Sequence, residues 1–241
     1  MSVLVRHRGP ARPRTRLVCF PHAGAPPGFF TAWGAGLPAH TEVLTARYPG
    51  SPAEGAALGD VAALAAAALD ALAPRPTHLF GHSMGALVAY ETARRLRRPP
   101  ARLYVSACDA PPVGRAPVDV SGDDALLGEL RRIGGTDPGL LGDEAALAAL
   151  LPRIRHHFDL LNGYAFSSGP PLTCPVTAFH AHQDTEATAD AVGRWREVTA
   201  AGFDLRGFPG DHFYLVAQRD QLLAEIGTRL DAPAADWQLA P

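Results

Sequence analysis

Lysine is absent from this 241-residue sequence, and all 22 of its basic residues are arginine. Together with the abundance of alanine, glycine and proline, this points to GC-rich coding, and we draw no function from it. An excess of either charge is absent too, because 24 acidic residues leave a formal charge of −2. Such a balance gives no general reason to bind nucleic acid or an anionic membrane, and neither is expected as a partner.

Long apolar runs and cysteine are also scarce. No apolar stretch reaches the 18 residues of a membrane-spanning helix, and the opening "MSVLVRHRGPARPRTR" lacks the apolar segment of a signal peptide. The cysteines are an odd number without metal-ligand spacing, so we expect reduced, buried thiols at Cys19, Cys108 and Cys174. These absences favour a cytoplasmic protein without a metal site.

The residues that are present predict an α/β fold. With 47% apolar residues, the chain suits one domain, residues 1–241, with a substantial core. Short apolar strand candidates alternate with helical patterns, which predicts a mostly parallel sheet with helices on both faces. The expected strands are 16–24, 41–50, 77–81, 102–107, 175–181 and 203–210. The expected helices are 58–73, 84–98, 188–200 and 213–230.

One stretch, residues 111–170, breaks this alternation because it holds no convincing strand. It contains two helical patterns, "DDALLGELRRIGG" and "EAALAALLPRIRHHFDLLNGY". An insertion of this size over the strand ends is typical of a lid, and the glycine- and proline-containing joint 134–143 would let its helices shift. A second packing layer is the alternative. His156 and His157 in this stretch are expected to be surface or packing residues.

The stretch "HLFGHSMGALVAYE" (78–91) carries the main chemical signal. A strand that turns into a helix within one or two residues forces its turn residue into strained backbone angles and requires small neighbours. Gly81 and Gly85 bracket Ser83 in this way. The pattern predicts a nucleophile elbow, with Ser83 at the sheet edge and the N–H of Met84 free to meet developing negative charge.

A serine nucleophile needs a base, and the base needs an acid to orient it. In such folds these residues follow in the order serine, acid, histidine. Of ten histidines, His212 is the best placed, in a loop between the last strand and the last helix, whereas His82 is expected to shape the elbow. Two carboxylates compete for the role of the acid, Asp184 and Asp109, because both follow strands that end at the catalytic edge.

These residues resemble the type II thioesterases, stand-alone α/β-hydrolases that accompany modular polyketide and nonribosomal peptide synthases. The resemblance covers almost the whole chain. Its motifs are "CFPHAG" (19–24) followed by Trp33, "GHSMGA" (81–86), "LRRIGGTDPGLL" (130–141), "CPVTAFHAHQD" (174–184), "WREVT" (195–199) and "FPGDHFYL" (208–215). The family places its acid after the strand matched by 174–184, which favours Asp184 over Asp109. The chain departs from the family at Ala181, where glycine is usual, and at His182, where an acidic residue is usual.

The resemblance implies hydrolysis of acyl groups from the phosphopantetheine arm of an acyl or peptidyl carrier protein, which clears aberrant or stalled units. Ser83 would attack the thioester, His212 would take its proton, and Asp184 would orient the imidazole. The oxyanion would be met by the N–H of Met84 and, by the resemblance, that of Ala23. No metal or diffusible cofactor is required.

Other functions use the same residues. A carboxylester hydrolase, or an acyl-transferring or cyclising thioesterase, would share the triad, and a non-catalytic carrier-binding module is the alternative from another class. Because carrier proteins are commonly acidic, arginines near the substrate entrance are candidates for docking, and Arg131 and Arg132 in the insertion are the favoured pair. A second cluster ends the elbow helix: Arg94, Arg95, Arg97 and Arg98. A solubilising surface is the other interpretation of either cluster.

Overall fold

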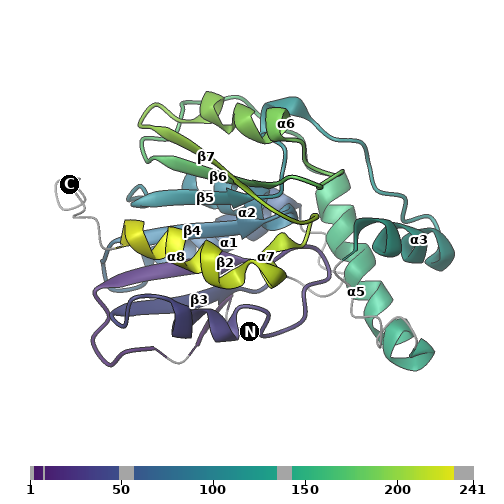
Figure 1. The fold of residues 1–241 in the computed structure, drawn as a ribbon, viewed down its shortest axis with the longest axis horizontal. Coiled ribbons are helices and arrows are strands. Elements are labelled where there is room, and N and C mark those ends of the chain that lie inside the picture. Colours follow the sequence, from purple (N-terminus) through teal and green to yellow (C-terminus); the bar gives the residue numbers. More distant parts are fainter. Residues whose placement is uncertain (1–2, 8, 49–56, 135–142, 231–241) are drawn as a thin grey trace.

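The computed structural model describes residues 3–7, 9–48, 57–134 and 143–230 (Figure 1). Seven strands form one sheet in the order β1-β3-β2-β4-β5-β6-β7. Strand β1 is antiparallel to β3, and β2 to β7 run parallel. The strands are β1 (Leu4–Arg6), β2 (Thr15–Phe20), β3 (Thr41–Ala46), β4 (Thr77–His82), β5 (Arg102–Ser106), β6 (Val176–Ala181) and β7 (Phe203–Phe208). The predicted α/β fold with a mostly parallel sheet is confirmed.

Helices cover both faces of the sheet, as predicted. On one face lie α1 (Leu58–Asp70), α2 (Met84–Ala93), α6 (Ala189–Gly193) and the 3-10 helix η4 (Arg194–Val198). On the other face lie η1 (Thr31–Gly36), α7 (Tyr214–Ala217) and α8 (Arg219–Leu230), of which α7 and α8 are seen in front of the sheet in Figure 1. No helix in the described ranges is long and apolar enough to cross a membrane.

The alternation of side chains along β2 shows how the two faces are filled. Val18 and Phe20 join the apolar cluster that packs on α1 and α2, whereas Leu17 and Cys19 join the cluster under η1 and α8. All six residues of β2 are buried. A strand covered on both faces is a nearly continuous apolar run, and for this reason the sequence indicated the central strands.

Four elements differ from the predictions, and one of them is the helix expected at 213–230, which is divided into α7 and α8. Strand β1 was not predicted, because its three residues are too few to show an alternating pattern. The elbow helix ends at Ala93, so the arginines of 94–98 do not share a helical face. Beyond that point the N–H of Arg97 bonds the Asp70 carboxylate at the end of α1. The helix expected at 188–200 is divided into α6 and η4.

The helical insertion, residues 111–170, lies at one end of the sheet. It comprises η3 (Pro111–Val113), α3 (Asp123–Ile133) and α5 (Glu144–Asn162), and α3 and α5 contact each other (Figure 1). Its described residues, 111–134 and 143–170, contain no strand. Most of the predicted joint at 134–143 lies outside the described residues. That the insertion acts as a lid on a single domain stays a prediction.

Two glycines allow the chain to turn from β4 into α2. The backbone of Ser83 has φ 53° and ψ −126°, which is strained for a residue with a side chain. A Cβ on Gly85 would lie 2.0 Å from the carbonyl oxygen of Phe20, and one on Gly81 would lie 2.2 Å from that of Gly85. The backbones of β2, β4 and α2 therefore approach each other directly at this point, as the sequence pattern predicted.

We expect Gly85→Ala to lower the free energy of unfolding by at least about 3 kcal/mol, since the new methyl group meets backbone atoms that cannot rotate away. The corresponding fall in Tm, measured by circular dichroism, is about 6–12 °C for a chain of this size. Gly128→Ala is the matched control, because a Cβ at Gly128 in α3 meets nothing within 4 Å. An unchanged Tm for Gly85→Ala would contradict the backbone contact.

Candidate active site

The ends of β2 and β4 form a crevice at the edge of the sheet. These strands are neighbours, but the chain leaves them in opposite directions, from β2 to β3 and from β4 to β5. Loops diverge at such a switch point, and ligands of open α/β sheets bind there. Ser83 follows β4, whereas His22 and Ala23 follow β2, and all three residues line the crevice.

His212 and Asp184 form a buried pair beside this crevice. They lie in adjacent loops, after β7 and β6. The imidazole Nδ1 lies 3.0 Å from Asp184 Oδ2 and 3.2 Å from Oδ1. The Asp184 side chain is 0% exposed, and its Oδ1 also accepts the N–H groups of Glu186 and Ala187. Held in this way, the carboxylate keeps the imidazole proton on Nδ1 and leaves Nε2 as the nitrogen that can accept a proton.

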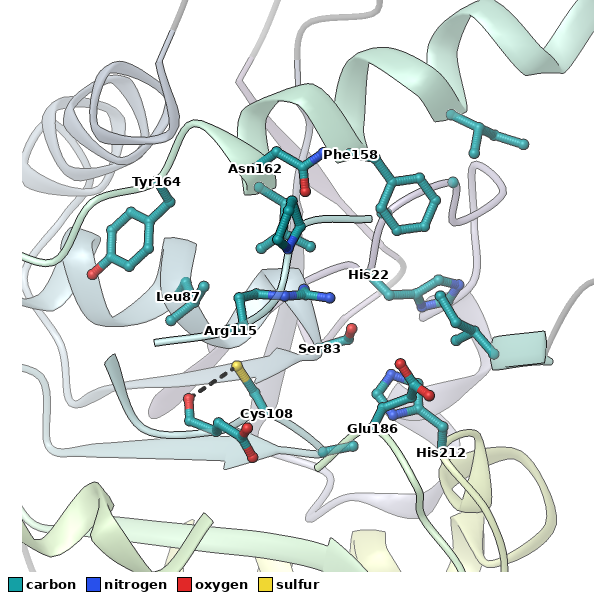
Figure 2. A pocket seen from close by; sticks show the side chains of 18 of the residues that line it. His22, Ser83, Leu87, Cys108, Arg115, Phe158, Asn162, Tyr164, Glu186 and His212 are labelled. Atoms are coloured by element: carbon teal, nitrogen blue, oxygen red, sulfur yellow. Dashed lines mark hydrogen bonds between the residues drawn. The ribbon is translucent and has the colours of Figure 1, made fainter. Parts of the chain in front are cut away.

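Ser83 and His212 line one cavity of about 830 Å³. Figure 2 shows the Ser83 hydroxyl and the His212 ring on one side of it, with Phe158 and Asn162 of α5 across the space. The insertion supplies much of the apolar lining: Leu130, Ile133, Leu150, Ile154, Phe158 and Leu161. A largely apolar cavity of this size, with a few polar groups at one end, is typical of a small-molecule site.

Asp109, the other candidate acid, also lines the cavity but stands apart from the imidazole. Among the described residues its carboxylate makes no hydrogen bond, and its Oδ1 is buried without a partner. Burial raises the pKa of Asp109 from 3.8 to about 6; Arg115 opposes this shift, and the carboxylates of Asp184 and Glu186 add to it. The structure therefore brings Asp184, and not Asp109, into hydrogen-bond contact with His212.

The two N–H groups predicted to meet an oxyanion come from different loops. Met84 is the first residue of α2, so its N–H has no partner within the helix. Ala23 lines the cavity in the loop after β2, and its N–H makes no hydrogen bond within the described part of the chain. The N–H of Ser83, in contrast, donates to the carbonyl of Ser106. Met84 directly follows Ser83, and Ala23 lines the same cavity as Ser83.

Comparisons with known proteins assign the chain to a family. The family model of the thioesterase domain matches residues 15–230. The chain belongs to the thioesterase family. It is 36% identical to a probable cadicidin biosynthesis thioesterase of Streptomyces griseus, over 91% of this chain and 64% of that protein. It is 33% identical to the gramicidin S biosynthesis protein GrsT of Aneurinibacillus migulanus, over 87% of this chain and 86% of GrsT.

A solved structure gives the same result for the fold of the thioesterase. The type II thioesterase BorB from the borrelidin biosynthetic cluster matches with a TM-score of 0.84 and 33% identity, covering 95% of this chain and 98% of BorB. The prediction of a type II thioesterase of polyketide or nonribosomal peptide biosynthesis is therefore confirmed. The chain spans less than two thirds of the cadicidin relative and nearly all of BorB.

Two further buried histidines lie near His212 in the thioesterase. The rings of His82 and His212 have centroids 5.3 Å apart, and His22 lies 5.7 Å from His82. Burial, and then the neighbouring His212, lower the pKa of His22 to about 3 and that of His82 well below its usual 6.5. Both rings are therefore neutral at pH 7. The His22 ring packs against Phe29 and Phe213, and the His82 ring is hydrogen-bonded to Ser106.

A hydrogen-bonded chain supports the elbow from behind. His82 Nδ1 lies 2.9 Å from Ser106 Oγ, which lies 2.7 Å from the Tyr214 hydroxyl. The contact agrees with the expected role of His82 in shaping the elbow. Ser106 and Tyr214 were not predicted, because they are 108 positions apart in the chain and only the fold brings them together.

The cysteines are free, as expected, but one of them is not fully buried. Cys19 and Cys174 lie in the core, whereas Cys108 is half-buried and lines the cavity. Burial raises the pKa of the Cys108 thiol to about 12. Because the thiolate is the reactive form, Cys108 does not compete with Ser83 as a nucleophile at pH 7.

The two arginines expected at the substrate entrance differ in their surroundings. Arg132 of α3 forms ion pairs with Glu129 and Glu186. Glu186 is also the residue whose N–H donates to Asp184, so Arg132 links the insertion to the loop that holds Asp184. Arg131, on the same turn, is exposed and forms no ion pair with the described residues. Of this pair, Arg131 is the one whose charge is unmatched.

Asp109→Asn is expected to stabilise the protein in a pH-dependent way. The folded state raises the Asp109 pKa from 3.8 to about 6, so stability is lost as the pH rises through this interval and the carboxylate ionises. The full shift corresponds to about 3 kcal/mol, which partial exposure reduces to about 1–2 kcal/mol. Asparagine cannot ionise, so the Tm should rise by about 2–8 °C near pH 8 and stay unchanged near pH 4. Calorimetric scans at both pH values measure this difference, and an equal shift at both would contradict it.

Proposed function

We propose that the chain is a serine thioesterase that hydrolyses acyl groups from the phosphopantetheine arm of carrier proteins, with Ser83 as nucleophile, His212 as general base and Asp184 as the orienting acid. The observation that carries the proposal is the buried His212–Asp184 bond beside the cavity that Ser83 lines from its strained turn. The family supplies the reaction class, which is thioester hydrolysis.

In the first step, Nε2 of His212 takes the proton of the Ser83 hydroxyl as its oxygen attacks the thioester carbonyl. Asp184 keeps the other proton on Nδ1 and stabilises the imidazolium that forms. The carbonyl oxygen becomes negative and is met by the N–H groups of Met84 and Ala23, each of which lowers the barrier by about 3 kcal/mol. The intermediate then collapses, the C–S bond breaks, and His212 gives its proton to the departing thiolate sulfur.

In the second step, water activated by the same imidazole attacks the acyl-serine and releases the free acid. Meanwhile the acyl chain lies among the apolar side chains that α3 and α5 contribute to the cavity. The insertion is then the lid expected from the sequence, because it shields the acyl-enzyme from bulk water. The acyl groups removed would be aberrant or stalled units on the carrier protein.

The carrier protein would dock at the rim of the cavity and send in only its phosphopantetheine arm. Leu130 and Ile133, in the last turns of α3, line the cavity, so Arg131 between them lies near its rim. Its unmatched positive charge suits an acidic carrier surface. Arg132, although also predicted to dock, already has two carboxylate partners.

Ser83→Ala and His212→Ala are each expected to lower kcat for acyl-carrier hydrolysis by about three orders of magnitude or more, since attack and proton transfer act as a unit. Asp184→Asn should lower kcat by about 10²–10⁴-fold by presenting the wrong tautomer, and Asp109→Asn should lower it by less than about tenfold. The measurement is acid release from an octanoyl-loaded carrier protein by variants whose Tm matches that of the wild type.

A serine-directed fluorophosphonate is the control for these variants. It should label the wild type at Ser83 and fail to label Ser83→Ala. Near-normal turnover by Ser83→Ala, free of wild-type enzyme, would overturn the mechanism. The reverse ranking of the two aspartate variants would transfer the role of the acid to Asp109. A matched octanoyl oxyester separates a thioesterase from a general ester hydrolase, and product analysis with added alcohols detects acyl transfer.

Arg131→Glu is expected to raise KM for the acyl-carrier substrate by about 2- to 5-fold and to leave KM for octanoyl-pantetheine unchanged. Added salt should have the same effect on the wild type, because rim charges act through screened attraction. Arg14→Glu is the matched control, since Arg14 is exposed and directly precedes β2, at the end of the parallel strands opposite to Ser83. Equal impairment on both substrates would indicate a damaged insertion, and no effect on either would exclude Arg131 from docking.

A further inference from the structure

Helix α5 contacts the loop after β2 at Gly24 through two side chains. The N–H of Gly24 donates to Nδ1 of His157 at 3.0 Å, and its carbonyl oxygen accepts from Nη2 of Arg153 at 3.5 Å. A Cβ on Gly24 would lie 3.2 Å from Cγ1 of Ile154. Both polar groups of this residue and its packing surface are therefore contacted from one turn of α5.

Gly24 directly follows Ala23, the proposed oxyanion donor. Gly24 has φ +76°, and the N–H of Ala25 donates to the carbonyl of His22 at 3.2 Å, so residues 22–25 form a tight turn. Ala23 and Gly24 are the two central residues of this turn. We infer that a displacement of Gly24 changes the backbone angles of Ala23 and with them the direction of its N–H.

The start of the same loop is anchored by a residue that follows β3. The hydroxyl of Tyr48 donates to the carbonyl of Pro21 at 2.9 Å. Its ring also packs against the ring of His157, with centroids 5.6 Å apart. The loop is thus fixed at Pro21 by a residue that follows β3, and at Gly24 by α5. Both anchors involve His157 of α5, which packs against Tyr48 and accepts the N–H of Gly24.

His157 makes a more specific contact than the surface or packing position predicted for it would require. The residue is buried, and it accepts a hydrogen bond from a backbone group 133 positions away in the chain. An imidazole nitrogen accepts such a bond only when it carries no proton. The adjacent His156 is buried as well, but it makes no hydrogen bond within the described ranges.

We propose that His157 is a positioning residue for the reaction. With Arg153 and Ile154 it sets the Ala23 N–H, so the oxyanion hole is complete only when α5 is seated on Gly24. This inference rests on the proposed function, since it acts through Ala23. An acyl chain that fits the cavity leaves α5 in place and is turned over quickly. A chain that displaces α5 loses one oxyanion donor and is turned over slowly, which couples the fit of the substrate to catalysis.

Substitutions at His157 test whether the acceptor itself matters. His157→Leu removes the acceptor and keeps a large apolar side chain, whereas His157→Asn restores an acceptor because its amide oxygen can occupy the place of Nδ1. We expect His157→Leu to lower kcat for octanoyl-pantetheine by about 10- to 100-fold with KM nearly unchanged, and His157→Asn to recover most of the loss. His156→Leu, the same change one residue earlier, is the matched control and should keep wild-type kcat.

An octyl trifluoromethyl ketone reports on the oxyanion hole directly. The Ser83 oxygen adds to its carbonyl carbon, the serine proton passes to His212, and the carbonyl oxygen becomes a stable oxyanion in the hole. The Ki of this ketone should rise in His157→Leu by the factor by which kcat/KM falls, and it should return towards the wild-type value in His157→Asn.

Equal losses of kcat in His157→Leu and His157→Asn, at wild-type Tm, would overturn the inference, as would an unchanged Ki in both. If His157→Leu does not fold, His157→Gln takes its place as the variant without an acceptor. The glutamine side chain is one carbon longer than that of asparagine, so its amide oxygen lies beyond the position of Nδ1. Fluorophosphonate labelling separates the two proposals. If the wild type is neither labelled at Ser83 nor active, the proposed function is wrong. If the wild type is labelled and active and His157→Leu is fully active too, only the proposed role of His157 is wrong.

Discussion

Where β2 ends, its last carbonyl groups lie against the first turn of α2 with no side chain between them. A Cβ on Gly85 would lie 2.0 Å from the carbonyl oxygen of Phe20, so only glycine permits this approach. The approach requires the abrupt turn that gives Ser83 its φ of 53°, a strain of about 1–3 kcal/mol that the surrounding core offsets. It also brings the N–H of Met84 beside the loop that carries Ala23. The proposed nucleophile and both proposed oxyanion donors thus depend on one backbone contact.

The helical insertion contacts two loops of the site, the loop after β6 and the loop after β2. Each contact is made by a different helix of the insertion. Helix α3 reaches the loop of the acid through the ion pair of Arg132 with Glu186, whose N–H donates to Asp184. Helix α5 reaches the loop after β2 through His157 and Gly24. An exposed ion pair contributes about 0–1 kcal/mol and a hydrogen bond about 1 kcal/mol. Contacts of this size are weak enough for a substrate to displace the insertion, as the proposed role of His157 requires.

The parts of the site that the sequence could predict are those set by local chemistry. The glycines around Ser83 reveal the turn because its steric requirement falls within five residues, and the burial of β2 on both faces makes it a continuous apolar run. The resemblance to a family, and not spacing, favoured Asp184 over Asp109, since both follow strands at the same edge. The contact of His157 with Gly24 joins positions 133 residues apart, and the end of α2 depends on Asp70 of another helix. Contacts of this kind depend on the packing of distant segments, and no local pattern encodes them.

The charges around His212 explain why one carboxylate can act as the acid while another stands nearby. His22 and His82 are held neutral, so the imidazolium formed during the reaction meets no neighbouring positive charge from them. Asp184 is buried and bonded to Nδ1, and two backbone N–H groups keep its carboxylate in place. Asp109 has a pKa of about 6 and is mostly ionised at pH 7, yet it shares no hydrogen bond with the ring. It therefore stabilises the imidazolium only through space, a weak effect beside a bonded carboxylate. Only the bonded carboxylate can also select the tautomer, and for this reason we propose Asp184 and not Asp109 as the acid.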